Sequence, residues 1–490
     1  MRKFPIIVLG ALILSLCLCG AQADETTLED GAVYKLTSQY TGMSIAASCF
    51  GMSQLATIAQ TESYTGSLNQ GWRAHREEDG TFKLENLSAG LYLTLYKNSK
   101  KDGATISLSE EKDSLSQRWT LKAYEDGVRI VSASSGKCLQ LQDDSRDLKC
   151  HVVQNEIGAG ISQKWRVTKL DDGTTEYPVM LNLKGDYHVI SCPEIIKADG
   201  VYYLFGDNRD GCGIRRSADL IKWEAIGNAC TYKNGFTSLW QQNEVEKGEL
   251  WCPGIYKIGD VYHIYYAITT IGSRRSAIGT YTNKTLNPDS PDYKWVEAGA
   301  VIRSYDTCGY NCIDPCVITD EDGLTWLLFG SGWSGIKLTR LDPETGLLLN
   351  PENPTLIPLS FFYTDGYCEG GYVKYYNGYY YLIQASGYMK AGKYVNRVGR
   401  SEKVTGPYVD RDGRPMMKSG GTQLTEDKES MTMPGHCSLF KDDDGQWYFV
   451  MEYFPEGADA TLGLSTIVWD KAGWPWTAMT PNVLSLGNCQ

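Results

Sequence analysis

Five residues that could carry acid, base or metal chemistry recur at one place in a repeated sequence pattern. They are Cys192, Cys252, Asp314, Glu369 and His436, and each lies eight or nine residues before the second residue of a turn pair. Charged side chains are costly to bury unless they are paired or used, so this group is a candidate functional site. Two carboxylates facing one cleft suit glycosidic cleavage, because one donates a proton to the leaving oxygen and the other activates water or stabilises charge.

The turns that follow these residues belong to five copies of one unit. Each copy has a glycine-containing turn pair that leads into an aromatic strand, at 199–204, 259–264, 322–327, 377–382 and 444–449. The copies are spaced by 60, 63, 55 and 67 residues, without convincing helical periodicity between them. Five antiparallel units of this kind predict a five-bladed β-propeller. The strand before each turn is then the innermost one, which places the five candidate residues at the mouth of the central channel.

A different repeat occupies the first third of the chain. The tripeptide Gln-x-Trp occurs at 70–72, 117–119 and 163–165, with spacings of 47 and 46 residues and short alternating strands between. Repeats of this length cannot each bury a core, so we expect three of them to close around a shared axis. We interpret the Gln and Trp side chains chiefly as packing residues. Cys138 and Cys150 are the pair we expect to form a disulfide in this domain.

Composition narrows the class of protein. The chain has 490 residues, which is too long for one ordinary core, and its net charge of −12 argues against binding to a phosphate backbone. The first 23 residues combine Arg2 and Lys3, the apolar run 6–18 and the small-x-small pattern 21–23. This pattern predicts a cleaved signal peptide. We therefore expect a secreted, extracellular monomer that has no partner in the membrane and binds no nucleic acid.

Both repeat regions resemble known families. Residues 27–168, with their three Gln-x-Trp motifs, resemble the ricin-type β-trefoil lectins. Residues 185–485 resemble glycoside hydrolase family 43, and within it the endo-α-1,5-L-arabinanases. The stretches that carry this second resemblance are 276–279, 285–295, 311–315, 330–338, 398–401 and 405–408. The two resemblances imply an all-β chain, with a signal peptide (1–23), a carbohydrate-binding trefoil (24–168), a linker (169–184) and a five-bladed propeller (185–490).

The family resemblance implies an inverting hydrolase with three acids. By position, Glu369 matches the general acid and Asp314 matches the second acid, which raises the pKa of the donor and orients it. His436 matches a central histidine associated with a bound cation, usually calcium, that it contacts through water. The general-base position of the first blade, which is Asp-Pro in the family, holds Cys192 followed by Pro193. Glu194, two residues further along the same strand, is a possible substitute base, and Asp186 is another.

Three hypotheses follow from the missing base. The chain is a secreted hydrolase of α-1,5-L-arabinan or a related arabinose-containing plant polysaccharide with a displaced base, or it is a carbohydrate-binding protein that has lost turnover. In the third hypothesis the ring of five residues has become a soft-metal or redox site. The simpler interpretation of Cys192 and Cys252 is that they form a disulfide between adjacent blades or pack as buried thiols.

Recognition of a neutral furanose polymer should use aromatic platforms and hydrogen bonds to hydroxyl groups. Trp251 and Trp333 lie beside the ring on inner strands or on the loops that leave them, and we expect them to be such platforms. Tyr310 and Asn311 are further candidates for the rim of the site. The expected partner is therefore the polysaccharide substrate, and the acidic surface needs no charged partner.

Overall fold

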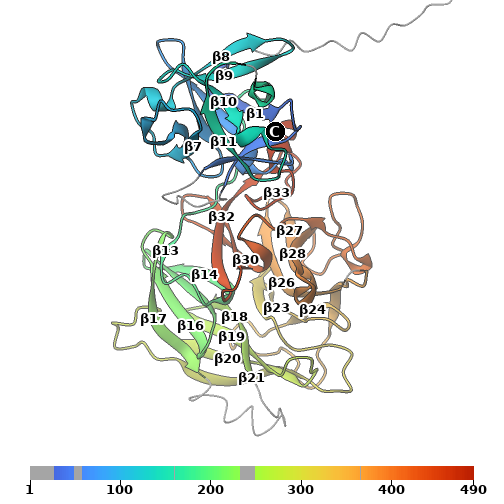
Figure 1. Cartoon of the computed structure of the whole chain (residues 1–490). Coiled ribbons are helices and arrows are strands. Elements are labelled where there is room, and N and C mark those ends of the chain that lie inside the picture. Colours follow the sequence, from blue (N-terminus) through green and yellow to red (C-terminus); the bar gives the residue numbers. More distant parts are fainter. Residues whose placement is uncertain (1–26, 49–57, 159, 232–248, 365) are drawn as a thin grey trace, which may run out of the picture.

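The computed structural model describes residues 27–48, 58–158, 160–231, 249–364 and 366–490. The predicted signal peptide lies outside these residues. Figure 1 shows two domains, an N-terminal one drawn in blue to teal and a larger C-terminal one drawn in green to red. Regular structure in the described residues is strand together with short 3-10 helices. Within these ranges no helix has the length and apolar character that a membrane crossing needs.

The N-terminal domain is one sheet of 12 strands with three similar lobes. Its strands are β1 (Val33–Ser38), β2 (Ser44–Ala47), β3 (Ala59–Glu62), β4 (Trp72–Arg76), β5 (Phe82–Asn86), β6 (Tyr92–Leu95), β7 (Ala104–Ser109), β8 (Trp119–Tyr124), β9 (Gly127–Ser132), β10 (Cys138–Leu141), β11 (Cys150–Asn155) and β12 (Trp165–Asp171). A 3-10 turn ends at the Gln of each Gln-x-Trp motif: η1 (Leu68–Gln70), η3 (Leu115–Gln117) and η5 (Ile161–Gln163). This arrangement confirms the predicted β-trefoil.

The three tryptophans hold equivalent places in the trefoil core. Trp72, Trp119 and Trp165 are fully buried, and each indole N–H donates to a backbone carbonyl, of Ile45, Leu93 and Leu139, at 3.0, 3.0 and 3.1 Å. Each motif glutamine is also buried and donates its amide to a backbone carbonyl. The repeat is therefore architectural, as the sequence predicted, because each lobe uses the same residues to fill the shared core.

The predicted disulfide between Cys138 and Cys150 is wrong. Cys138 lies opposite Asn155 in the β10–β11 pairing, and Cys150 lies five positions from Asn155 at the other end of β11. The two Cα atoms are then about 17 Å apart along the strand, whereas a disulfide needs them within about 7 Å. Both residues are unbonded thiols, as is every other cysteine in the described ranges.

The C-terminal domain consists of five sheets, one for each repeat of the sequence. The first blade consists of β13 (Lys184–Gly185), β14 (Ser191–Ala198), β15 (Val201–Asn208), β16 (Gly211–Ser217) and β17 (Lys222–Thr231), and the second of β18 (Glu249–Ile258), β19 (Val261–Thr269), β20 (Ser276–Asn283) and β21 (Val296–Ser304). The third blade consists of β22 (Cys316–Thr319), β23 (Thr325–Phe329), β24 (Ile336–Arg340) and β25 (Ile357–Ser360), and the fourth of β26 (Tyr367–Tyr376), β27 (Tyr379–Tyr388), β28 (Lys393–Ser401) and β29 (Thr422–Gln423). The fifth blade consists of β30 (Thr432–Lys441), β31 (Trp447–Phe454), β32 (Thr461–Trp469) and β33 (Pro475–Trp476). The innermost strands of the five sheets contact one another in a closed ring: β14 contacts β18, β18 contacts β22, β22 contacts β26, β26 contacts β30, and β30 contacts β14. This is the predicted five-bladed propeller.

Residues that the sequence analysis assigned partly to the linker pair with the last blade and so close the ring of blades. Met180 and His188 form isolated β-bridges with Ser465 and Thr461 of β32 in the last blade. Leu181 N–H donates to Leu464 O at 2.8 Å on the same edge. Residues from about 179 onward therefore extend the fifth sheet, and the part without strand pairing between the domains is shorter than 169–184.

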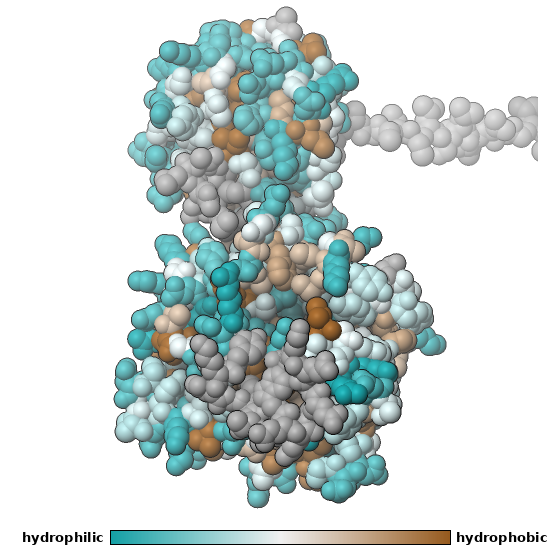
Figure 2. Space-filling view, turned by 60° about the horizontal axis from the view of Figure 1, so that its bottom comes forward, coloured by the Kyte–Doolittle hydropathy of each residue, from teal (hydrophilic) through white to brown (hydrophobic). Residues whose placement is uncertain are grey.

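The two domains meet through the C-terminal segment. The 3-10 helix η8 (Val483–Asn488) lies against the trefoil, where Leu484 N–H donates to Gly66 O at 3.0 Å. Asn69 donates its side-chain amide to Glu429 at 3.2 Å across the same boundary. On the face shown in Figure 2, hydrophobic residues are scattered among hydrophilic ones over both domains.

Candidate active site

A break in strand pairing places the candidate residues at the same level in each blade. The pairing of the innermost strand with its neighbour shifts after Ser191, Trp251, Glu369 and Gly435, which is the signature of a β-bulge. The bulge residues have positive φ: 51° at Cys192, 51° at Cys252, 57° at Gly370 and 27° at His436. Asp314, just before β22, has φ 58°. Non-glycine residues in this region are strained and cluster at functional sites.

The structure corrects the position of Glu369 by one residue. The sequence aligned Glu369 with Cys192, Cys252 and Asp314, but Gly370 occupies the bulge position in the fourth blade and Glu369 is the last paired residue before it. A Cβ atom on Gly370 would lie 2.9 Å from His436 Nδ1. Glycine at 370 thus leaves space for the imidazole, and the acid enters the site from the preceding position.

Asp314 and Glu369 form a pair of buried, interacting carboxyl groups. Asp314 is buried and accepts the Gly370 N–H at 2.9 Å, and Glu369 accepts the Ser331 hydroxyl at 2.8 Å and a hydrogen bond from Tyr394. Burial, and then repulsion from Glu369, raise the pKa of Asp314 to about 7. Burial also raises the pKa of Glu369, while the two hydroxyl donors oppose the rise. A carboxylic acid that stays protonated near neutral pH is what a general acid requires.

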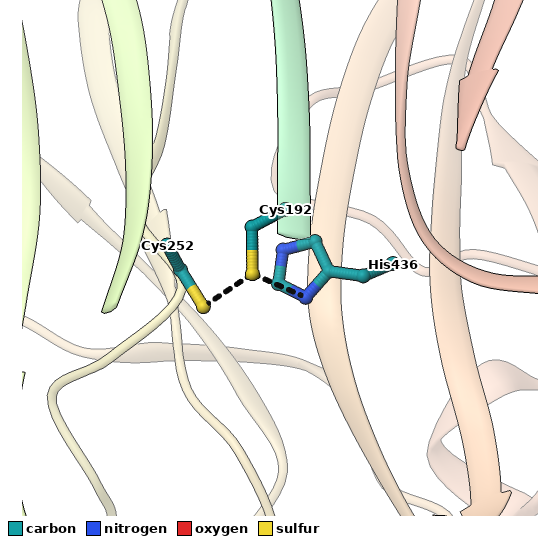
Figure 3. Close-up of side chains that lie close together, drawn as sticks. All are labelled: Cys192, Cys252 and His436. Carbon is teal, nitrogen blue, oxygen red and sulfur yellow. Dashed lines mark hydrogen bonds between the residues drawn. The ribbon is translucent and has the colours of Figure 1, made fainter. Parts of the chain in front are cut away.

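Cys192, Cys252 and His436 lie together beside this pair. Cys192 Sγ is 2.7 Å from Cys252 Sγ and 3.4 Å from His436 Nδ1. Figure 3 shows the two thiols and the imidazole pointing toward one another from three different strands. Burial lowers the pKa of His436 to about 4, so the imidazole is neutral at pH 7. The pKa of each thiol is raised well above its usual value, chiefly by burial.

Two acidic residues that the sequence analysis did not identify complete the group. Asp207, near the end of β15, accepts the Cys252 N–H at 2.8 Å, and Glu452 in β31 accepts the Cys192 N–H at 2.9 Å. Burial and nearby carboxylates, including Asp314, raise the pKa of both, that of Glu452 to about 8. Each is a single acidic residue in an apolar strand of the aromatic repeat, and this is the signal that could have identified it.

Glu194 does not take the position of the missing base. Its carboxylate accepts the Ile255 N–H at 2.8 Å and the Tyr372 hydroxyl at 3.0 Å. The bulge at 192–193 separates Glu194 from Cys192 along β14, and both hydrogen bonds of the Glu194 carboxylate go to innermost strands of other blades. Asp186 is also bound elsewhere, since it accepts the Ala225 N–H at 2.9 Å next to the outer strand β17.

The four predicted substrate contacts have different environments. Trp333 is 43% exposed, with the Arg274 guanidinium 5.9 Å from its ring, and Trp251 is half-buried on β18. Tyr310 is half-buried and packs edge-on against Phe329. Asn311 is 4% exposed and accepts a hydrogen bond from Ser276. Its side chain is therefore bound inside the second blade, and its predicted contact with substrate stays a prediction.

The donor atoms around His436 do not fit calcium. Calcium takes six to eight oxygen ligands, whereas the atoms that face His436 Nδ1 are the sulfurs of Cys192 and Cys252. The hydrogen-bonded carboxylates Asp207 and Glu452 contact the backbone of the two cysteines. The calcium ion that the resemblance implies beside His436 thus does not fit the donor atoms that face Nδ1, and no catalytic step here depends on it.

Comparisons with known proteins agree with both domains. The family model described as Glycosyl hydrolases family 43 matches residues 187–475, and the model described as ricin-type beta-trefoil lectin domain-like matches 22–109 and 115–187. The extracellular exo-alpha-(1->5)-L-arabinofuranosidase of Cellvibrio japonicus is 33% identical over 305 residues, which cover 58% of this chain and 84% of that protein. The extracellular endo-alpha-(1->5)-L-arabinanase 1 of Bacillus subtilis is 34% identical over 250 residues, which cover 50% and 74%.

A solved structure has the same propeller. The alpha-L-arabinanase of Cellvibrio cellulosa, solved in complex with arabinohexaose, superposes with a TM-score of 0.55 at 30% sequence identity. The match covers 59% of this chain and 95% of that one. With a family match over more than half of its residues, the chain belongs to the glycosyl hydrolases of family 43, and a ricin-like β-trefoil precedes its hydrolase propeller.

Proposed function

We propose that this protein is a secreted glycosidase that hydrolyses α-1,5-L-arabinan or a related arabinose-containing plant polysaccharide with inversion. The observation that carries the proposal is the acid pair: Glu369 is held by Ser331 and Tyr394 beside the buried Asp314, and burial raises the pKa of both carboxyl groups. The two relatives named above are extracellular and act on α-(1->5)-linked arabinose, as their names state, which supports the substrate and the location.

In the proposed reaction Glu369 donates its proton to the glycosidic oxygen as the bond to the anomeric carbon breaks. Asp314 orients the backbone beside Glu369 by accepting the Gly370 N–H, and repulsion between the two carboxyl groups disfavours ionisation of both at once. Water attacks the anomeric carbon from the opposite face and releases its proton to solvent water on the side where the family's base would accept it. Cys192 occupies that side. Trp251 and Trp333 provide stacking surfaces for the chain, and the trefoil (24–168) binds the same polysaccharide.

The test has two measurements on the full chain. One is the release of reducing ends from linear arabinan, and the other is the anomeric configuration of the first product, determined by NMR. Glu369→Gln should abolish release because the amide cannot donate the proton. Asp186→Asn is the matched control, since Asp186 lies outside the acid pair. A first product with retained configuration, or equal rates for wild type and Glu369→Gln above background, contradicts the proposal.

A second candidate function is carbohydrate binding without turnover. It is favoured by the state of Cys192, because a buried thiol with a strongly raised pKa does not accept a proton from water near pH 7. Wild type and Glu369→Gln would then be equally inactive, and both would be retarded to the same degree in arabinan affinity gels. Loss of retardation in a variant of the trefoil alone would assign binding to that domain.

A further inference from the structure

We propose that Cys192, Cys252 and His436 form a binding site for one thiophilic metal ion, with zinc as the probe, at the mouth of the propeller channel. One ligand atom from each residue lies within 4.8 Å of the other two. The three residues come from the innermost strands of the first, second and fifth blades (Figure 3). Two sulfurs and one imidazole nitrogen are donors that zinc and other soft cations prefer, and that calcium and magnesium do not take.

The backbone holds both cysteines in position for a shared ligand. Cys192 and Cys252 have the same φ, 51°, in matching bulges of neighbouring blades. Their N–H groups are fixed by the carboxylates of Glu452 and Asp207, at 2.9 and 2.8 Å. The pocket for the imidazole depends on Gly370, whose missing side chain leaves His436 free of contact there. Outer residues of this kind orient the ligands of metal sites in proteins.

Carboxylates in contact with the thiols can complete the coordination. Asp207 forms a hydrogen bond with the Cys192 side chain, and Asp314 forms one with the Cys252 side chain. In a three-ligand zinc site the fourth position is taken by a water or a further side chain. Zinc binding would release the two thiol protons to solvent, and no oxidation is involved because zinc has no redox chemistry.

The separation of the two sulfurs, as it stands, matches neither a metal site nor a disulfide. Two thiolates on one tetrahedral zinc are about 3.8 Å apart for Zn–S bonds of about 2.3 Å, and a disulfide bond is about 2.05 Å long. The observed 2.7 Å lies between them. Rotation by about 20° around the Cα–Cβ bond of each cysteine, within one rotamer well, moves the sulfurs apart by about 1 Å. The imidazole then remains as a third ligand, whereas a disulfide would leave it without a role.

The position of this site matters for the reaction. Cys192 occupies the position of the family's general base, and zinc lowers the pKa of a coordinated water to about 7. That is the chemistry that the missing carboxylate would supply. This role in hydrolysis rests on the proposed function, whereas metal binding itself does not.

The test uses the full chain, prepared under reducing conditions and stripped of metal. Zinc is titrated against a chromophoric chelator, bound zinc is counted by elemental analysis, and cobalt(II) reports thiolate ligation by its sulfur-to-metal absorption. We expect one zinc per chain, and at least a 100-fold weaker affinity in Cys192→Ser and in Cys252→Ser. Cys192→Asp is a second variant, because its backbone position suits Asp, and its cobalt–sulfur absorption should be weaker because only the Cys252 thiolate remains. Cys138→Ser, a buried thiol of the trefoil, is the control.

Three results would overturn the proposal: a Cys192–Cys252 disulfide found by peptide mass spectrometry in protein isolated without reductant, zinc stoichiometry unchanged in Cys192→Ser, or calcium bound in place of zinc. Activity is measured separately on the same samples. Zinc binding without arabinan hydrolysis would support the metal site and contradict the proposed function. Arabinan hydrolysis by a chain that binds no zinc would support the proposed function and contradict the metal site.

Discussion

Replacing Cys192 by Asp tests the proposal that position 192 is that of the family's general base. The backbone at 192 has φ 51°, a conformation in which Asp is several-fold more common than most other residues. The Glu452 carboxylate still accepts the N–H at this position, and Cys252, whose sulfur is 2.7 Å from that of Cys192, can donate its S–H to the new carboxylate. The fold should therefore accept the substitution.

The magnitude follows from the role of a base. A positioned general base contributes about 10²–10⁴-fold to the rate, which is about 3–5 kcal/mol of transition-state stabilisation. At the carboxyl separation of inverting enzymes, about 6.5–9.5 Å, the new charge repels an ionised Glu369 by about 2 kcal/mol at an effective dielectric constant of about 20. This repulsion favours the protonated form of Glu369 and so helps the general acid.

The assay is reducing-end release from linear arabinan by metal-free wild type, Cys192→Asp and Cys192→Asp/Glu369→Gln, at pH 6–8. We expect kcat/KM to rise by about 10²–10⁴-fold in the single variant and to return to the wild-type background in the double variant. The reasoning is refuted if Cys192→Asp folds, binds arabinan and hydrolyses it no faster than metal-free wild type. An increase that persists in the double variant would show that Glu369 is not the acid.

Three further predictions test other parts of the molecule. Glu369→Gln should lower kcat with little change in KM, because the amide keeps the contact with Ser331 but has no proton to donate, and a changed KM alone would contradict the role. Burial raises the pKa of Glu452 from 4.5 to about 8, so Glu452 ionises at lower pH in the unfolded state and the free energy of unfolding should fall between about pH 5 and 8. Glu452→Gln should remove up to about 5 kcal/mol of this fall, measured by urea denaturation at each pH. An unchanged dependence of the free energy of unfolding on pH would refute this prediction. Trp119→Ala should destabilise the trefoil by about 3–5 kcal/mol because the indole is buried and its N–H is hydrogen-bonded. Leu115→Ala, at an exposed position in the same lobe, should cost less than about 0.5 kcal/mol. Equal losses of stability would show that the indole is not a core residue.

The sequence was sufficient for the architecture because both repeats are enforced by local chemistry. Each Trp of the Gln-x-Trp motifs has one place where its ring is buried and its N–H is satisfied, so the repeat predicts the trefoil. The aromatic strands after each turn likewise predict the blades. The position of Glu369 relative to Gly370 was missed because a β-bulge changes the register by one residue, and spacing to a turn cannot detect it.

The sequence predicted only those candidate residues that lie on or next to the innermost strands. Cys192, Cys252, Asp314 and His436 are all on or next to innermost strands, and alignment of the repeats identified them. Asp207 and Glu452 come from second strands, where they lie opposite Ser191 and Gly435, the residues next to the bulges of their own blades. Their contact with the cysteine N–H groups is a tertiary property that sequence spacing does not contain.

The pairing of Met180 with Ser465 joins residues roughly 280 positions apart in the chain. At about 5–20 residues per second, a ribosome needs about 15–60 s to synthesise the segment between them. During that interval the segment around Met180 has no β32 to pair with, and its backbone is open to pairing with other chains. We therefore expect completion of the ring to be the late, slow step of folding, with the trefoil already formed while the last blade is being made.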